Sequence, residues 1–451
     1  MTFDAKIKSV SSSSQQRERI LNPPFYVDIA ALTAVVLYAA LCAFRVATSV
    51  VSYQIWGAVT ALVGLVTVLG VGVSRGRLRS QFLTFFVAVS AVGSAFGGII
   101  YRAQSGCTGV AKECGANMET AVVERGGELL LRHGSPYLDI AVLPHPQVWH
   151  YNPYSPLLSV FGVPRAVVGA HWWTDARWFF MLATVLVLWA AWRAAQRPHI
   201  PGGALLVVAA LPPVTQNFVA AGIDALIVAL MVWAIVAVSR GQSFGAGLIA
   251  AAAVGMKLTA LPVVVVAAVF AFCRAGDNRT LDSARSAGST RSTRSIHSAD
   301  SASTARSVSS IRGIRGLLFV GATLLGMVAV YVPAFVLNRE AFLENVIRYP
   351  LGLARVTSSA QGGTPGQLIS SISPAGKSVV LGFLVVAALL IVAWMVWRPP
   401  RTATRAFAIS AVGLLAAMVL MPASRFGYLI YPAVLAAAAL TSFCDGTGRS
   451  Q

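Results

Sequence analysis

The side chains of this chain that could do chemistry gather in one polar stretch, residues 102–172. Carboxylates, imidazoles and phenols are the groups that exchange protons or hydrogen-bond with a polar substrate. Those in this stretch include Glu119, Glu124, Tyr137, Asp139, His145, His150, Tyr151 and Tyr154. Most of the remaining chain is apolar, so we expect it to position this stretch.

The composition indicates the class of protein. Of 451 residues, 56% are hydrophobic and 11% are charged, and the mean hydropathy is +0.71. A soluble globular domain carries about 25% charged residues, so this chain has too few charges to cover a water-facing surface. The net charge of +19 does not indicate nucleic-acid binding, because the arginines lie mostly in short loops between apolar runs, as in membrane proteins.

The apolar runs predict the fold. A membrane-spanning helix needs about 20 predominantly apolar residues. The runs that approach this length are residues 26–47, 53–74, 81–101, 174–195, 203–220, 222–239, 244–258, 259–273, 315–337, 378–397, 405–421 and 427–443. We therefore predict an all-α polytopic membrane protein with a bundle of about 11–12 transmembrane helices.

Two regions depart from simple spans. Residues 244–258 and 259–273 are short for two spans, and Lys257 and Pro262 lie at their join, which predicts a bent hairpin of two short helices. Residues 155–170 are apolar but contain Pro164 and Arg165, so we expect a half-helix that either lies at the membrane interface or dips into the membrane.

The distribution of Lys and Arg predicts the orientation in the membrane. With a cytoplasmic N-terminus, the arginine-rich short loops face the cytoplasm, and residues 102–172 and 339–376 form two extracytoplasmic loops of a plasma-membrane protein. The first apolar run has no cleavage site after it, so it predicts an uncleaved anchor rather than a signal peptide.

The same pattern divides the chain into five parts. They are a disordered cytoplasmic N-terminus (1–25), a transmembrane core (26–275), a disordered Ser/Arg-rich cytoplasmic loop (276–312), a C-terminal transmembrane part (313–443) and a cytoplasmic tail (444–451). For the Ser/Arg-rich loop, contact with anionic lipid headgroups is the alternative to a solvated linker.

Cys107 and Cys114 share the polar stretch. On the oxidising, extracytoplasmic side of the membrane they could form a small-loop disulfide, and free thiols are the alternative. A metal site would need further ligands at close spacing.

A helix is predicted inside the polar stretch. Apolar side chains recur at helical spacing over residues 118–131, and Gly134 and Pro136 end the run. We expect an amphipathic helix over residues 120–132 that lies flat on the membrane with its apolar side toward lipid. In a purely structural helix the acids, including Glu119, would simply be solvated.

Other candidate residues lie at membrane depth. Lys257 could bind a lipid phosphate, or it could extend its charged end to the interface. Asp224 lies at the start of a span, and its role could be no more than a favourable contact with the helix dipole. Arg425 and Tyr428 lie at an outer turn and could face the same cavity as Lys257.

The second outer loop, residues 339–376, contains Arg348 and Tyr349 before a run rich in Ser, Gly and Gln. This composition suits a lid or an acceptor groove, and a plain surface loop is the alternative.

Three stretches of sequence carry a resemblance to a known family. They are Glu119 to Gly134-Ser-Pro136-Tyr137 with Tyr151-Asn-Pro153-Tyr154 after it, Asn217 through Gly222-Ile-Asp224 to Lys257-Leu-Thr259, and Phe342 to Tyr349-Pro350-Leu-Gly352. In this order they resemble glycosyltransferase family 87, the mannosyltransferase-like membrane proteins of actinobacteria that have the GT-C fold and use polyprenol-phosphate sugars.

The resemblance implies a mechanism and a set of site residues. The enzyme would move a hexosyl unit, with mannose the family default, from a polyprenyl-phosphate donor to a cell-envelope glycolipid or polysaccharide by inverting displacement. Glu119 stands where the family usually has Asp and would be the base, with Glu124 and Asp139 in reserve. Lys257, Arg348 and Arg425 would bind the donor phosphate, and the pocket would include Tyr137, His150, Tyr154, Asp224 and Tyr349.

No cofactor is expected, because the lipid donor is already activated. The sequence has no Asp-x-Asp pair, which argues against a bound divalent ion. The expected partners are the lipid-linked donor, the acceptor and membrane lipids.

Three other functions stay open at this level. An arabinofuranosyltransferase would use a related donor. A transporter or flippase would suit the predicted break at Lys257, although the chain lacks internal symmetry. A scaffold without chemistry would tolerate replacement of Glu119.

Overall fold

The computed structural model describes residues 21–73, 77–106, 115–274, 299–351, 353–356, 360 and 362–445. Throughout these ranges the regular secondary structure is helical. The protein is an all-α polytopic membrane protein, as the apolar runs predict.

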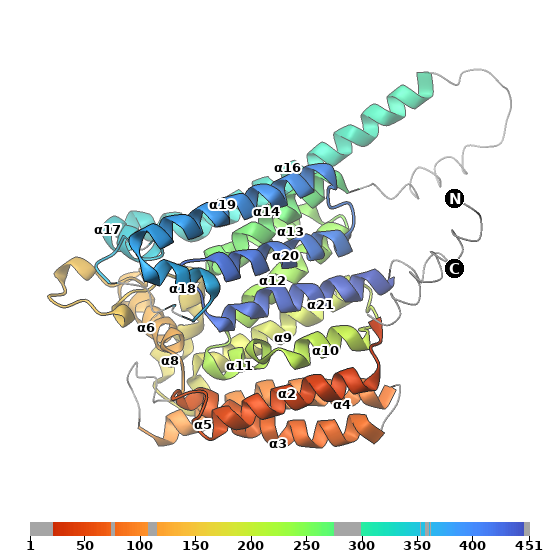
Figure 1. Ribbon diagram of the computed structural model, residues 1–451. Coiled ribbons are helices and arrows are strands. Elements are labelled where there is room, and N and C mark those ends of the chain that lie inside the picture. The colour runs from red at the N-terminus through yellow and green to blue at the C-terminus, as the bar shows by residue number, and fades with distance from the viewer. Residues whose placement is uncertain are drawn as a thin grey trace.

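The α-helices follow one another along the chain and are joined mostly by short loops (Figure 1). They are α2 (Phe25–Ala43), α3 (Val51–Val73), α4 (Arg77–Ala88), α5 (Ser94–Gln104), α6 (Met118–His133), α7 (Pro156–Ser159), α8 (Val163–Val168), α9 (Ala176–Ala194), α10 (Gly202–Ala210), α11 (Pro212–Ala220), α12 (Ile223–Ser239), α13 (Ser243–Met256), α14 (Leu261–Cys273), α16 (Ala299–Leu337), α17 (Arg339–Phe342), α18 (Pro365–Ile372), α19 (Pro374–Trp397), α20 (Ala403–Leu420) and α21 (Ile430–Asp445).

Each predicted span contains at least one helix in the part of the chain that the structure describes. Among the described residues, seven helices are long and apolar enough to cross a membrane, and α10 and α11, which bend by 56° at their break, would form an eighth span. The other predicted spans correspond to the shorter apolar helices α12, α13, α14 and α21. The predicted break at Lys257 is confirmed, because α13 ends at Met256 and a 3₁₀ turn (Leu258–Ala260) connects it to α14.

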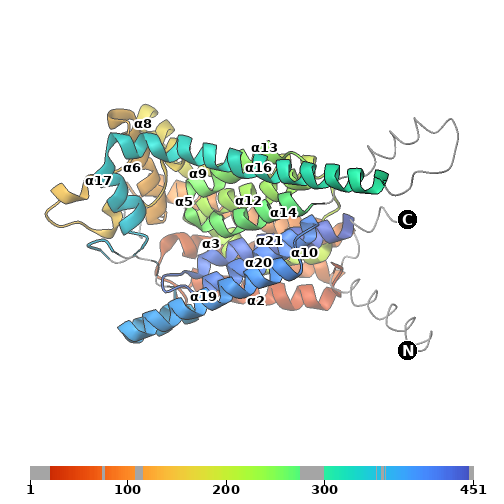
Figure 2. The same ribbon diagram turned by 90° about the horizontal axis from the view of Figure 1, so that it is seen from above.

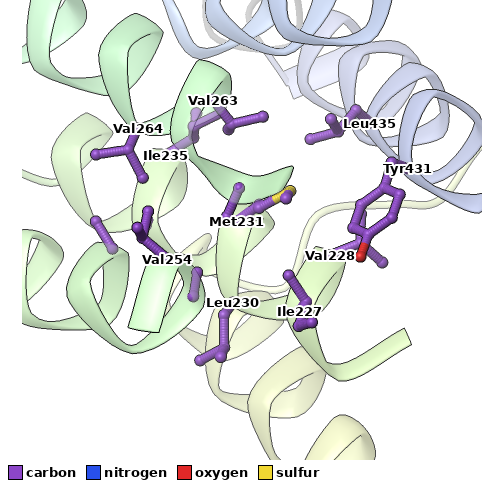
Figure 3. Packing of buried hydrophobic residues seen from close by; sticks show 14 of the residues in the cluster. Ile227, Val228, Leu230, Met231, Ile235, Val254, Val263, Val264, Tyr431 and Leu435 are labelled. Atoms are coloured by element: carbon purple, nitrogen blue, oxygen red, sulfur yellow. The ribbon is translucent and has the colours of Figure 1, made fainter. Parts of the chain in front are cut away.

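Helix α12 is the centre of the bundle. It is apolar on all sides, and nearly all of its side chains are buried, as expected of a helix surrounded by others. Figure 3 shows Met231 of α12 among Val254 of α13, Val263 of α14 and Tyr431 of α21. Helices α2, α3 and α4 pack as a separate group at one side, around Trp56 (Figure 1).

The outermost helix, α19, has an exposed apolar surface. Several of its large side chains, such as Phe383 and Leu390, are more than half exposed. A soluble monomer rarely exposes so large an apolar surface, so this helix faces lipid.

Two details of the sequence analysis are corrected. Helix α16 begins at Ala299, so residues 299–312 are helical and not part of a disordered loop. On α6, Val122 and Val123 are buried against protein and do not face lipid. The apolar side of α6 packs on α7 and α8, because Gly127 lets the backbone around Gly162 approach closely.

The two long polar loops meet at one end of the bundle, where α6, α8, α17 and α18 lie (Figures 1 and 2). We call it the loop end. Asn345 joins the two loops and is fully buried. Its side-chain oxygen accepts a hydrogen bond from the backbone nitrogen of Asn152 at 2.7 Å, and its amide nitrogen donates to the carbonyl oxygen of Leu138 at 3.1 Å.

We predict that Asn345→Ala destabilises the protein. The change leaves the backbone nitrogen of Asn152 and the carbonyl of Leu138 buried without a partner, which costs about 1–3 kcal/mol. Thermal unfolding in detergent would measure the loss, and Asn22→Ala at an exposed position is the matched control. Equal melting temperatures for the two variants would contradict this role of Asn345.

Candidate active site

A cavity of about 210 Å³ opens at the loop end between α6, the 3₁₀ turn after Lys257, and the segments around Tyr349 and Arg425. The polar and aromatic side chains that line it come from five separate parts of the chain. They are Asn117, Glu119, Tyr151, Tyr154, Lys257, Thr259, Tyr349, Arg425 and Tyr428.

Glu119 lies in the first turn of α6 and is only 8% exposed. The helix begins at Asn117, whose side chain accepts a hydrogen bond from the nitrogen of Met118. Its start is fixed to α11, because the backbone nitrogen of Asn117 and the hydroxyl of Thr120 both donate to the carbonyl oxygen of Ala220, at 2.9 and 3.2 Å. The alternative of a solvated acid is therefore wrong for Glu119.

Arg425 faces Glu119 across the cavity. One terminal nitrogen of its guanidinium lies 3.1 Å from a carboxylate oxygen of Glu119. The contact is an ion pair without good hydrogen-bond geometry, because that oxygen and Nε of Arg425 are buried without a hydrogen-bond partner. The Glu119 carboxylate raises the pKa of Arg425 by more than burial lowers it, so the guanidinium stays charged.

Lys257 is held more firmly than Arg425. Its ammonium group lies 2.6 Å from Oδ1 of Asp224 and 4.5 Å from the ring centre of Tyr428. The same carboxylate oxygen accepts a hydrogen bond from the hydroxyl of Tyr431 at 2.6 Å, and that hydroxyl accepts one from Thr259 at 3.3 Å. This pairing compensates for the burial of both charges.

The junction between α11 and α12 positions both charged pairs. The backbone turns at Gly222, whose φ of 79° is readily reached only by glycine. The side-chain oxygen of Asn217 accepts from the backbone nitrogen of Ala225 at 3.0 Å and so fixes the first turn of α12, which carries Asp224. The carbonyl of Ala220, which anchors α6, lies in the same junction.

The structure brings together five of the predicted site residues and places a sixth directly behind them. Glu119, Tyr154, Lys257, Tyr349 and Arg425 line the cavity, and Asp224 pairs with Lys257. The expectation that Arg425 and Tyr428 share a cavity with Lys257 is confirmed. Burial raises the pKa of the Tyr154 hydroxyl well above its usual value, so this group stays protonated.

Five other predicted residues do not line the cavity: Arg348, Asp139, Tyr137, His150 and Glu124. Arg348 and Asp139 line a second cavity, where Arg348 pairs with Glu344. Tyr137 is buried beside Phe342 and donates to the carbonyl of Tyr154 at 2.9 Å. His150 accepts a hydrogen bond from the backbone nitrogen of Gln147, so it stabilises a turn.

Glu124 belongs to a buried charge network away from the cavity. Arg102 contacts both of its carboxylate oxygens, at 3.0 and 2.8 Å, and Arg165 lies 3.3 Å from it. Arg102 also pairs with Asp175 at 2.9 Å. The oxygens of Glu124 are thus occupied, which makes it a poorer base candidate than Glu119.

Tyr431 and the carbonyl of Ala220 contribute to the site although neither is among the residues predicted from the sequence. Tyr431 is three residues after Tyr428, which is the spacing of one helix face and was an available signal. No local signal marks Ala220, because its carbonyl acts through residues far away in the chain.

The predicted disulfide and a metal site both concern this end of the protein. Cys107 and Cys114 lie outside the described residues. Within the part of the chain that the structure describes, no group of three or more His, Cys, Asp or Glu side chains is arranged to hold a metal ion.

We predict that Lys257→Met destabilises the protein, because it leaves the carboxylate of Asp224 buried without its cation. Loss of one partner of a buried pair costs about 3–5 kcal/mol, whereas removal of both is close to neutral. The double variant with Asp224→Asn should therefore recover most of the stability in a thermal unfolding assay. Lys377→Met, at an exposed position, is the control. If Lys257→Met is as stable as this control, the ion pair with Asp224 does not stabilise the protein.

Comparison with known proteins gives one match. Residues 151–287 match the model of glycosyltransferase family 87. The matched segment includes the α11–α12 junction, Asp224 and Lys257, whereas Glu119 and Arg425 lie outside it. No curated protein and no solved structure matches the chain.

Proposed function

The match to glycosyltransferase family 87 indicates a glycosyltransferase, and on that premise we propose that it transfers a mannosyl unit from a polyprenyl-phosphate donor. The acceptor would be a glycolipid or polysaccharide on the extracytoplasmic side. The observation that carries this proposal is the single cavity in which one buried carboxylate, Glu119, opposes two cations, Lys257 and Arg425.

The proposed reaction is one displacement at the anomeric carbon. Glu119 accepts the proton of an acceptor hydroxyl, and the hydroxyl oxygen forms a bond to the anomeric carbon of the donor. The bond between that carbon and the phosphate oxygen breaks, and its electron pair leaves with the polyprenyl phosphate. Because attack and departure occur on opposite faces, the configuration at the anomeric carbon inverts.

The two cations have different roles in this proposal. In the cavity and directly behind it, the charges of Lys257 and Arg425 are balanced by those of Asp224 and Glu119. A donor phosphodiester brings one further negative charge. The loosely bonded Arg425 is the cation that can turn toward this charge, whereas Lys257 stays hydrogen-bonded to Asp224.

This difference couples donor binding to activation of the base. When Arg425 moves from Glu119 to the donor phosphate, the Glu119 carboxylate becomes free to accept a proton. The charge on the phosphate increases as the bond breaks, so the cations stabilise the transition state more than the bound donor. Apolar side chains of the cavity wall, including Leu258 and Met421, provide a surface for the lipid end of the donor.

We predict that Glu119→Gln retains expression and donor binding but lowers sugar transfer by about 10²–10⁴-fold, the usual contribution of a general base. Transfer would be measured in membranes supplied with labelled polyprenyl-phosphate mannose or arabinofuranose. Glu128→Gln, on the exposed side of the same helix, is the matched control. Full transfer by the Glu119 variant would remove it as the base, and movement of lipid-linked sugar without a new glycosidic bond would identify a flippase.

We predict that Arg425→Gln weakens donor binding by about 10–100-fold, because charged hydrogen bonds contribute roughly 1.5–3 kcal/mol. Arg425→Lys should restore part of the affinity, since it keeps the charge but loses the planar donor geometry. Equilibrium binding of a non-hydrolysable polyprenyl-phosphonate sugar would measure both variants. Donor affinity equal to that of the unmodified protein would show that Arg425 only neutralises Glu119.

A further inference from the structure

A second cavity, of about 310 Å³, lies at the loop end and is built from both long loops. Asp139 comes from the first loop, and Glu340, Glu344, Arg348 and Arg355 come from the second. Three carboxylates and two guanidinium groups therefore face one space. No step of the proposed displacement uses these residues.

The charges of this cavity exclude the role in donor-phosphate binding that the sequence analysis expected for Arg348. Its guanidinium lies 3.3 Å from Glu344 and 3.6 Å from Glu340, so two carboxylates already balance it. A phosphate entering here would also meet Asp139, and the total lining charge is negative. Like charges at such close range oppose the binding of an anion.

The lining suits a ligand with many hydroxyl groups. An ionised carboxylate accepts hydrogen bonds from two neighbouring hydroxyls, and a guanidinium donates to hydroxyl oxygens. Carboxylate–guanidinium pairs thus offer acceptors and donors side by side to a neutral saccharide.

The second cavity adjoins the first across one pair of aromatic rings. Tyr151 and Tyr349 both line the first cavity and stack with ring centres 4.5 Å apart. The hydroxyl of Tyr151 donates to Glu344 in the second cavity at 3.2 Å, and Ile140 of that cavity belongs to the same buried apolar cluster as the two rings. A saccharide held by Glu344 would therefore lie beside the Tyr151–Tyr349 pair, whose rings also line the first cavity.

We propose that the second cavity binds the saccharide part of the acceptor and directs one of its hydroxyls toward Glu119. The part of this inference that a hydroxyl is directed toward Glu119 rests on the proposed transfer reaction. The part that the cavity binds a saccharide does not depend on that reaction. The first loop supplies the base, and both loops supply the acceptor site, so the contact made by Asn345 between the loops aligns the two.

The test uses the full-length protein in detergent and octyl mannoside as the acceptor probe. Asp139→Asn and Glu344→Gln remove charge but keep the acceptor oxygens that bond Ala141 and Tyr151. Each variant should raise the KM for octyl mannoside about 10-fold, as expected from loss of a charged hydrogen bond. Donor affinity and hydrolysis of the donor by water should stay unchanged, and Arg132→Gln, an exposed change on α6, is the control.

Direct binding separates this inference from the proposed function. Loss of octyl mannoside binding in both variants, measured by titration calorimetry, supports the acceptor site. If the unmodified protein binds octyl mannoside but transfers no sugar, only the proposed transfer reaction is refuted. An unchanged KM and unchanged binding overturn the inference. A raised KM for the donor alone, or a preference for a cationic amine over the neutral glycoside, overturns it as well.

Discussion

The carbonyl oxygen of Ala220 is the point on which the geometry of the candidate site depends. It accepts hydrogen bonds from both Asn117 and Thr120 and thereby fixes the first turn of α6 to the end of α11. The next residues of the chain turn at Gly222 into α12, which carries Asp224. One short junction therefore holds both elements. The carboxylate of Glu119 and the ammonium of Lys257 are positioned relative to each other by the hydrogen bonds to Ala220, the turn at Gly222 and the ion pair between Asp224 and Lys257.

The second constraint is the cost of burying charge in a protein with so few polar residues. The structure meets it in two ways. The network around Arg102, Glu124 and Asp175 is closely bonded and joins three segments of the chain, so it stabilises the fold. The pair formed by Glu119 and Arg425 is a single contact in which Oε1 of Glu119 and Nε of Arg425 have no hydrogen bond, so these two side chains are held together by less than those of the network.

The two long loops form two cavities, and we propose that one binds the lipid donor and the other binds the saccharide acceptor. The cavity with Lys257 has an apolar wall and a balanced set of charges, which suits a lipid phosphate. The cavity with Glu344 has more carboxylates than guanidinium groups among its lining residues. Carboxylates accept hydrogen bonds, so this lining suits a ligand with hydroxyl groups. The stacked rings of Tyr151 and Tyr349 lie between the two cavities, so each proposed ligand would meet a different electrostatic environment.

The sequence by itself determined the membrane class, the positions of the long apolar helices, the break at Lys257 and the end of α6 at Gly134, because apolar periodicity, composition and turn residues are local properties. It also indicated that Arg425 and Lys257 share a cavity. Only the tertiary structure decided that Glu119 rather than Glu124 of the same helix lines that cavity, and that Arg348 lies elsewhere. Those outcomes depend on which segments, often more than a hundred residues apart, pack together and pair their buried charges, and no local pattern of residues encodes that choice.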